Sequence, residues 1–331
     1  MSKINDTGKA KISLTEIYNK FGTLAILVVL IIICSLATPV FLTHVNIINL
    51  LVQTAVVTMI ACGITLLVIT GNTDLSAGSM VALVGCIAVG TFKNLYESGT
   101  NIFMAGAAGI GLALAASLAL YGACGVIITR YRAPAFIVTL AVSTGARGLA
   151  LMYTKAKVIV PIGPISGLGL GRVFGFIPIP VIAMVIIAVI TWIFLKKTRF
   201  GKYLYAIGGN REAAIAAGIN TNMVIIQAYI IYAIFVAIAG VLFMARLNSG
   251  QPSEAVGLEF KAITAAIIGG TSLAGGIGTV TGTIIGSMII GIISNVLTLL
   301  HVQSYYQQII TGIVIVLAVV IDIKTKGGMR K

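Results

Sequence analysis

Long apolar runs separated by short polar segments are the main pattern of this 331-residue chain. Because a helix of about 20 mostly apolar residues crosses the hydrocarbon core of a bilayer, we interpret ten runs as transmembrane helices. The predicted spans are 22–40, 47–69, 77–92, 102–128, 134–153, 178–195, 222–244, 260–275, 280–300 and 306–321. The short alternating segments of a membrane β-barrel are absent from this pattern. The sequence therefore predicts an all-α polytopic membrane protein of about ten transmembrane helices.

Composition supports this class. Hydrophobic residues make up 59% of the chain and charged residues only 9%, whereas a soluble domain carries roughly 25% charged residues. The four cysteines, Cys34, Cys62, Cys86 and Cys124, all stand in apolar runs without a CxxC pair. That placement favours small buried hydrophobic residues over a disulfide or a metal site.

The positions of lysine and arginine predict the orientation. With the N-terminus inside, the inner segments hold fifteen of these residues and the outer segments five, as the positive-inside rule requires. Both termini are then cytoplasmic, with a segment 1–21, a permease domain 22–321 and a tail 322–331. The net charge of +14 needs no nucleic acid, since it faces an anionic inner leaflet.

Two glycine-rich polar turns resemble each other. "GNTDLSAG" (71–78) and "GGTSLAGG" (269–276) agree at four of eight places and lie six predicted spans apart. We interpret them as a degenerate parallel repeat that breaks two spans. Irregular backbone at membrane depth is tolerated where it packs in protein or faces water, and glycine-interrupted segments in two matching halves indicate a transport pathway.

The polar residues of these turns are the first candidates for the pathway. They are Asn72, Asp74, Ser76, Thr271 and Ser272. We expect Ser76, Thr271 and Ser272 to cap the helices that follow, and Asp74 to lie near the positive end of a helix dipole. Two interpretations stay open: the turns gate or line a passage, or they only link and cap helices.

Three polar residues inside the spans are further candidates. Arg147 is a charge within a span, and such a group usually faces the bundle interior or water, although it is near enough to the outer end to snorkel. Gln53 and Asn295 carry amides that either bond between helices or meet a sugar hydroxyl. All three are assigned to the pathway as hypotheses.

Several kinds of chemistry are absent from the sequence. There is no GxxxxGK[ST] phosphate loop and no HExxH metal motif. Few acidic residues approach membrane depth, whereas ion-coupled carriers usually bury more ionisable groups. The pattern predicts a transport protein that is not an enzyme and binds no cofactor or metal. Its energy would come from another source than this chain.

One polar stretch, "GGNREAAIAAGIN" (208–220), lies in the basic loop 196–221. Gly208 and Gly209 are expected to break the chain, Asn210 to cap a short helix, and Gly218 to end it. The helix is either an ordinary interfacial helix or a docking element. Its apolar side is mostly alanine, which anchors poorly in lipid and suits a partner's cleft.

This stretch resembles the Gly-…-Glu-Ala-Ala-…-Gly element of permease subunits of bacterial ATP-binding-cassette importers. "DLSAGSMVAL" (74–83), "PAFIVTL" (134–140), "KTRFGKYLYAIGGN" (197–210), "GGTSLAGGIGTVTGT" (269–283) and "QSYYQ" (303–307) are similar, in the same order, to the ribose-type monosaccharide permease family. The resemblance covers roughly residues 22–325. Two departures are Asn72-Thr73 before Asp74, and Lys261 where the family often carries an acid.

The resemblance implies a multi-pass permease of the bacterial plasma membrane. Its partners would be a second permease chain, two separate ATPase domains that bind the ATP, and a periplasmic sugar-binding protein. The cargo would be a neutral monosaccharide, ribose or a related pentose or hexose. The element that contacts the ATPase would comprise Gly208, Gly209, Asn210, Glu212, Ala213, Ala214 and Gly218. The alternatives are an ion-coupled carrier or channel for a small polar solute, and a structural membrane scaffold.

Overall fold

The computed structural model describes residues 14–326, and the side chains of residues 22–320. The long helices are α1 (Leu14–Ala37), α2 (His44–Ile69), α3 (Ala77–Glu97), α4 (Ile102–Arg130), α5 (Ala135–Thr154), α7 (Ile179–Lys197), α10 (Thr221–Leu247), α12 (Val280–Leu299) and α13 (Ser304–Lys326). The shorter elements are η1 (Gly163–Ser166), α6 (Gly167–Leu170), β1 (Arg172–Val173), β2 (Ile177–Pro178), α8 (Arg199–Gly209), α9 (Arg211–Ala216) and α11 (Leu258–Ile268).

Seven helices within the described residues are long and apolar enough to cross a membrane: α2, α3, α4, α5, α7, α10 and α12. The all-α polytopic class is therefore confirmed, but the count of ten spans is not. The described apolar parts of α1 and α13, Gly22–Ala37 and Ser304–Val320, are shorter than these seven. The cytoplasmic placement of the termini stays a prediction, and residues 1–13 and 327–331 lie outside the described part.

The interpretation of 260–275 as a full span is wrong. The helix in this region, α11, ends at Ile268 and has only 11 residues, which at 1.5 Å per residue is about 16 Å of helix. The chain then runs without helix from Gly269 to Thr279 before α12 begins. The cause is local: Gly270, Gly275 and Gly276 have positive φ angles of 90°, 84° and 76°, which a helix does not accommodate.

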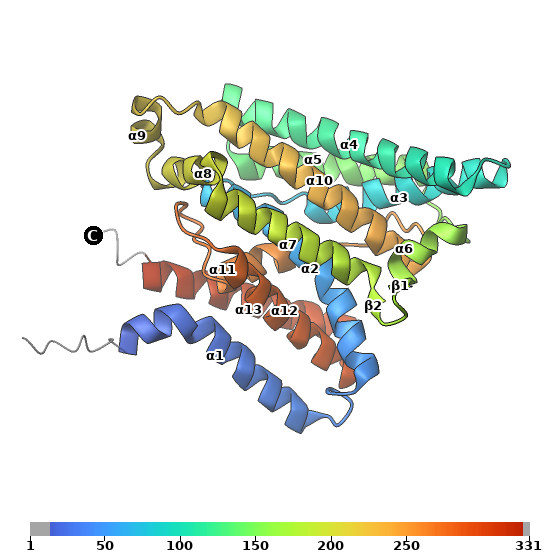
Figure 1. Ribbon diagram of the computed structural model, residues 1–331, viewed down its shortest axis with the longest axis horizontal. Helices are drawn as coiled ribbons and strands as arrows, with labels where there is room; N and C mark the ends of the chain where they lie inside the picture. Colours follow the sequence, from blue (N-terminus) through green and yellow to red (C-terminus); the bar gives the residue numbers. More distant parts are fainter. Residues whose placement is uncertain (1–13, 327–331) are drawn as a thin grey trace, which may run out of the picture.

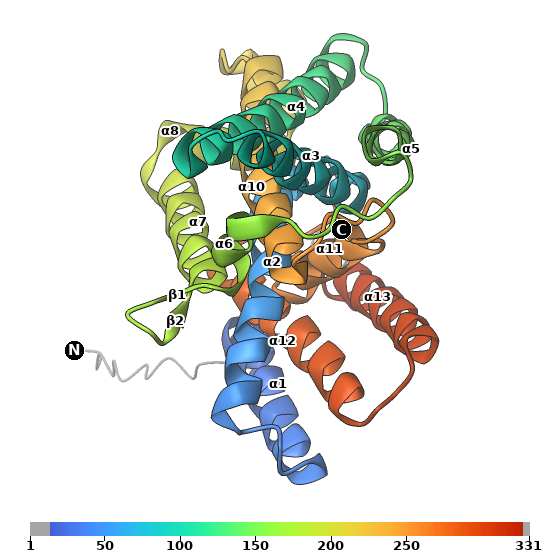
Figure 2. The same ribbon diagram turned by 90° about the vertical axis from the view of Figure 1, so that its right-hand side faces the viewer.

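Helices α2 and α10 form the centre of the molecule. Helix α10 packs against α2, α3 and α4, while α2 also packs against α7, α11 and α12. Helix α1 lies along α12, and α13 lies along α11, on the opposite side of the molecule from α4 (Figure 1). Helix α5 contacts α3 but stands at one edge, as the turned view shows (Figure 2).

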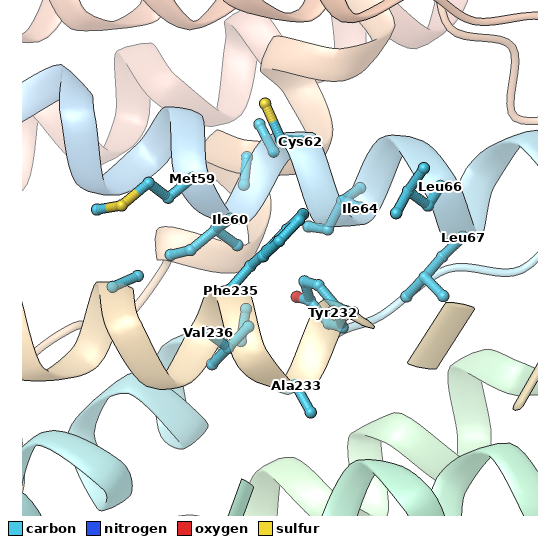
Figure 3. Close-up of a cluster of buried hydrophobic side chains, with 14 of the residues drawn as sticks. Met59, Ile60, Cys62, Ile64, Leu66, Leu67, Tyr232, Ala233, Phe235 and Val236 are labelled. Carbon is cyan, nitrogen blue, oxygen red and sulfur yellow. The ribbon is translucent and has the colours of Figure 1, made fainter. Parts of the chain in front are cut away.

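The largest core cluster lies where α2 meets α10. Figure 3 shows Met59, Ile60 and Ile64 of α2 in one cluster with Tyr232 and Phe235 of α10. The three α2 residues and Tyr232 are fully buried. Lipid tails are as apolar as these side chains, so helix association in a membrane depends on close packing and polar contacts rather than on the hydrophobic effect. This core thus fixes α10, which carries Tyr232, relative to α2, whose end leads into the first glycine turn.

A small antiparallel hairpin marks the end of the molecule opposite α9. Its strands β1 and β2 pair Arg172 with Pro178 and Val173 with Ile177. With η1 and α6 it connects α5 to α7. This end of the molecule also contains the N-terminus of α2 and the C-terminal ends of α10 and α12 (Figure 1).

Candidate functional site

The predicted polar helix exists as α9, beside α8. The Asn210 side chain accepts a hydrogen bond from the Ala213 N–H at 3.0 Å, so its role as N-cap is confirmed. Gly218 has a φ of 81°, and the Ile219 N–H reaches back to the Ala214 carbonyl at 3.0 Å. The helix therefore ends at a glycine in the left-handed region, as predicted.

The predicted chain break at Gly208 and Gly209 is wrong, because α8 continues through both residues. A Cβ placed on Gly208 would collide with the Ile69 carbonyl oxygen and the Gly276 nitrogen, whereas a Cβ on Gly209 would meet nothing within 4 Å. Gly208 therefore allows close packing of backbones, and the chain breaks one residue later, at Asn210.

Most of α9 is available for contact. Glu212 and Ala213 are exposed, Ala214 is buried, and Ile215 keeps 54% of its surface exposed. The helix projects from one end of the molecule (Figure 1). A groove of about 540 Å³ lies beside it and is lined by Thr129, Arg130, Arg132, Arg211, Glu212, Ile215, Ile219, Asn220, Thr221 and Asn222. The element thus combines a short small-residue helix with a basic groove.

The two glycine turns meet at α8. The Gly276 N–H donates to the Ile69 carbonyl at 2.8 Å, and the Tyr205 hydroxyl of α8 donates to the Gly278 carbonyl at 2.7 Å. A Cβ on Gly275 would lie 3.2 Å from the Gly71 nitrogen. A displacement of α8 would therefore act directly on the second turn, and on the first turn through Ile69 and through the contact between Gly275 and Gly71. The internal repeat itself stays a prediction.

Asp74 lies at the centre of a buried hydroxyl cluster. Its Oδ1 accepts from the Ser76 hydroxyl at 2.6 Å, and its Oδ2 accepts from Tyr232 at 2.8 Å and from Tyr121 at 3.2 Å. All four side chains are fully buried. The cluster joins the first turn to α4 and α10 and satisfies a carboxyl group that would otherwise be costly to bury.

Sequence reasoning missed Tyr121 and Tyr232. Both stand inside apolar runs, "LALYGAC" and "YIIYAIF", where a buried hydroxyl needs a partner. Two signals in the sequence could have indicated this cluster: an acid predicted at membrane depth, and tyrosines within apolar spans. Their pairing depends on how α4 and α10 pack.

The predicted helix caps in the turns are wrong. The Ser76 side chain makes no cap bond for α3, and the Gly78 N–H is bonded instead by Glu259 Oε2 at 3.1 Å. Helix α12 is capped by Thr279, whose Oγ1 accepts from the Gly282 N–H at 3.1 Å. Thr271 Oγ1 is buried without a hydrogen-bond partner among the described residues. Thr271 and Ser272 are too far from α12 to cap it, because the second turn continues for several residues before α12 begins.

Two more turn residues have local partners. Asn72 donates to Thr70 Oγ1 at 2.8 Å, and Ser272 Oγ accepts from the Ala274 N–H at 3.4 Å. Asn72 is partly buried and Ser272 is buried. Both side chains therefore support the shape of their own turn.

Arg147 ties α5 to the loop before α11. Its guanidinium donates to the carbonyl oxygens of Pro252 and Glu254, the latter at 2.8 Å. The side chain is partly buried, so it points into the protein rather than along the surface. Arg147 thereby connects α5 to the segment that leads into α11 and the second turn.

Asn295 and Gln53 lie away from both glycine turns, and their surroundings differ. Asn295 and Asn46 exchange two amide hydrogen bonds, at 3.0 and 2.9 Å, between α12 and α2. Gln53 lines a cavity of about 430 Å³ at the end of the molecule opposite α9. Asn295 thus makes the interhelical bond that was one of its two predicted roles, while Gln53 faces open space.

Comparison with known proteins gives a consistent result. The family model described as "Branched-chain amino acid transport system / permease component" matches residues 46–319. The ribose import permease protein RbsC of Bacillus subtilis is 40% identical over 96% of this chain and 97% of its own length. The protein of the same name from Escherichia coli K12 is 40% identical over 91% and 93%. The D-allose transport system permease protein AlsC of Escherichia coli K12 is 35% identical over 92% of each. No solved structure matches.

Proposed function

Because this chain belongs to the family of the branched-chain amino acid transport system permease component, we propose that it is the transmembrane subunit of an ATP-driven importer. The cargo is a neutral monosaccharide, ribose or a related pentose or hexose. Relatives named for ribose and for D-allose import cover almost the full chain. The protein is a multi-pass component of the bacterial plasma membrane, in line with its seven apolar helices.

The partners follow from this assignment. Two permease chains form the passage, two ATPase domains supply the energy, and an external sugar-binding protein delivers the cargo. No phosphate loop is present in the sequence, so ATP binds to the partner subunits. With both termini in the cytoplasm, α8 and α9 face the ATPase, and the end that carries β1 and β2 faces outward.

One observation supports the coupling mechanism above all others: Gly208 of α8 lies against Gly276 of the second turn and against Ile69, the end of α2 that leads into the first turn, and Tyr205 bonds Gly278. In this proposal the cleft of the ATPase holds the exposed residues Glu212 and Ala213 of α9, while the buried Ala214 packs α9 against the rest of the permease. Closure of the ATPase domains then displaces α8. That displacement moves the turns 71–78 and 269–276, which gate the passage for alternating access. Asn72, Asp74, Ser76, Thr271, Ser272 and Arg147 keep the gate in shape.

Reconstitution tests the function. The permease and its ATPase, together in proteoliposomes, should accumulate a labelled monosaccharide only when ATP and the binding protein are both supplied. An inactive ATPase variant is the matched control and should abolish accumulation. If the permease alone moved sugar along a proton or sodium gradient, the chain would be an ion-coupled carrier and the proposal would be wrong. If neither condition gave transport, a scaffold role would be favoured.

A further inference from the structure

The cavity that contains Gln53 is separate from the coupling element and from both glycine turns. We call it the α2–α13 cavity. Its walls come from α2, α10, the loop before α11, and helices α11, α12 and α13. The lining residues are Gln53, Thr54, Val56, Val57, Phe243, Arg246, Ser253, Glu254, Ala255, Val256, Leu258, Lys261, Ile290, Gly291, Ser294, Ser304 and Gln308.

Two cations of this wall lack a partner among the residues whose side chains the structure describes. Arg246 and Lys261 are both partly buried, and within the described residues the one ion pair is between Lys93 and Glu97. Neither Arg246 nor Lys261 has a side-chain hydrogen bond to another described residue. Partly buried charged groups are usually paired or hydrogen-bonded, so these two donors are available to a bound molecule.

The rest of the wall is a mixture of donors and acceptors. Gln53 and Gln308 carry amides that both donate and accept, Ser294 and Ser304 carry hydroxyls, and Glu254 only accepts. A simple anion needs donors alone, and a carboxylate in the wall would repel it. A molecule with many hydroxyls, each able to donate and accept, matches the mixture.

The size and the apolar part of the cavity fit the same molecule. Its volume of about 430 Å³ lies within the range of roughly 300–1,000 Å³ that is usual for small-molecule sites. Phe243 and Ile290 add apolar surface to the wall, which suits the C–H face of a sugar ring. Small-molecule sites typically combine such surface with a few polar groups that fix orientation.

We propose that the α2–α13 cavity is a monosaccharide-binding site within a single permease subunit. The proposal rests on the importer function above and places the site in the outer half of the membrane, away from α9. Arg246 and Lys261 donate charge-assisted hydrogen bonds to sugar oxygens, and Gln53 bonds a hydroxyl from α2. The site holds the sugar between its release by the binding protein and its passage through the gate at the turns.

The test uses the permease–ATPase complex in lipid nanodiscs without the binding protein, which would itself bind sugar. The probe is whichever of D-ribose, D-allose and L-arabinose the reconstituted complex takes up, in radiolabelled form. Wild type should bind this sugar saturably. Gln53→Leu and Lys261→Met should each weaken binding roughly tenfold or more, because each removes a hydrogen bond to the sugar.

Matched controls separate the site from general damage. Gln227→Leu and Lys157→Met remove the same groups at exposed positions outside the cavity and should bind like wild type. All variants should elute as intact complexes with unchanged thermal midpoints. Equal weakening in the controls, or full binding in both cavity variants, would overturn the proposal.

Three further outcomes are decisive. Saturable binding of chloride or D-gluconate in the cavity without binding of the transported sugar would make it an anion site and refute the proposal. ATP-driven uptake by a complex that shows no saturable sugar binding would refute this site and leave the importer function standing. A complex that takes up none of the three sugars with ATP would instead count against the importer function.

Discussion

Gly276 donates its backbone N–H to the carbonyl oxygen of Ile69 across 2.8 Å, which joins the second glycine turn to the last residue of α2. Gly208 of α8 lies against both of these groups, too close for any side chain. Three segments that are far apart in the sequence thus meet through backbone atoms alone. Such a contact transmits displacement, because no flexible side chain stands between the elements.

Gly208→Ala should therefore damage the protein. The added Cβ meets backbone atoms that are unable to rotate away, and overpacking of this kind costs about 1–3 kcal/mol. We expect a lower thermal midpoint of the purified permease and reduced ATP-driven sugar uptake. Gly209→Ala is the matched control for packing, since a Cβ there meets nothing within 4 Å, and it should keep the wild-type thermal midpoint. Equal effects of the two changes would contradict the packing role.

Glu212→Lys should uncouple ATP hydrolysis from transport. Glu212 is exposed on α9, and reversing a charge at a protein interface opposes docking and can cost several kcal/mol. We expect ATP hydrolysis to continue while sugar uptake falls roughly tenfold or more. The number of ATP molecules hydrolysed per sugar imported is the measurement.

The control for this change is Glu97→Lys, at the end of α3 and away from α9. Glu97 is exposed and forms an ion pair with Lys93 at 3.8 Å, a type of pair worth roughly 0–1 kcal/mol. Its ratio of ATP to sugar should match that of wild type. A wild-type ratio in Glu212→Lys would remove Glu212 from the coupling element.

Tyr232→Phe should destabilise the buried cluster around Asp74. The change removes the 2.8 Å hydrogen bond to Asp74 Oδ2, and a bond to a group of this kind contributes about 1.5–3 kcal/mol. Tyr229→Phe is the matched control, because the Tyr229 hydroxyl is buried without a partner among the described residues. Unfolding of the two variants in detergent should show a loss for Tyr232→Phe and no loss for Tyr229→Phe. The reverse order would show that the cluster does not stabilise the fold.

Asn46 and Asn295 should show coupled effects on stability. Asn46→Leu leaves the Asn295 amide buried without this partner, whereas Asn295→Leu leaves Asn46 with only its bond to the Phe41 carbonyl. Each change should cost about 1–3 kcal/mol, the larger loss being expected for Asn46→Leu. The double variant removes both amides and should lose less than the sum of the single changes. A double-mutant cycle on unfolding free energies measures the coupling, for which about 0.6–1.7 kcal/mol is expected in a membrane. Strict additivity would mean that the two amides do not stabilise each other.

The sequence predicted the parts of this site that depend on local chemistry. Asn210 and Gly218 were recognisable as the two ends of a short helix, because capping and left-handed backbone involve residues within a few positions. The caps expected from Ser76, Thr271 and Ser272 were wrong, because the bonds at these positions depend on the surrounding tertiary structure. Asp74 competes for the Ser76 hydroxyl, and Glu259, distant in the sequence, bonds the first turn of α3.

What the sequence by itself determined is the membrane class, the broken segments and the polar helix α9, since apolar run length, glycine and capping residues act over one or two helical turns. Only the tertiary structure decided that α8 meets the second glycine turn and the end of α2 before the first. It likewise decided that Tyr121 and Tyr232 surround Asp74, and that Arg246 and Lys261 share a cavity with Gln53. These relationships depend on how the helices pack against one another. The spacing of residues along the sequence does not by itself give the distance between two helices.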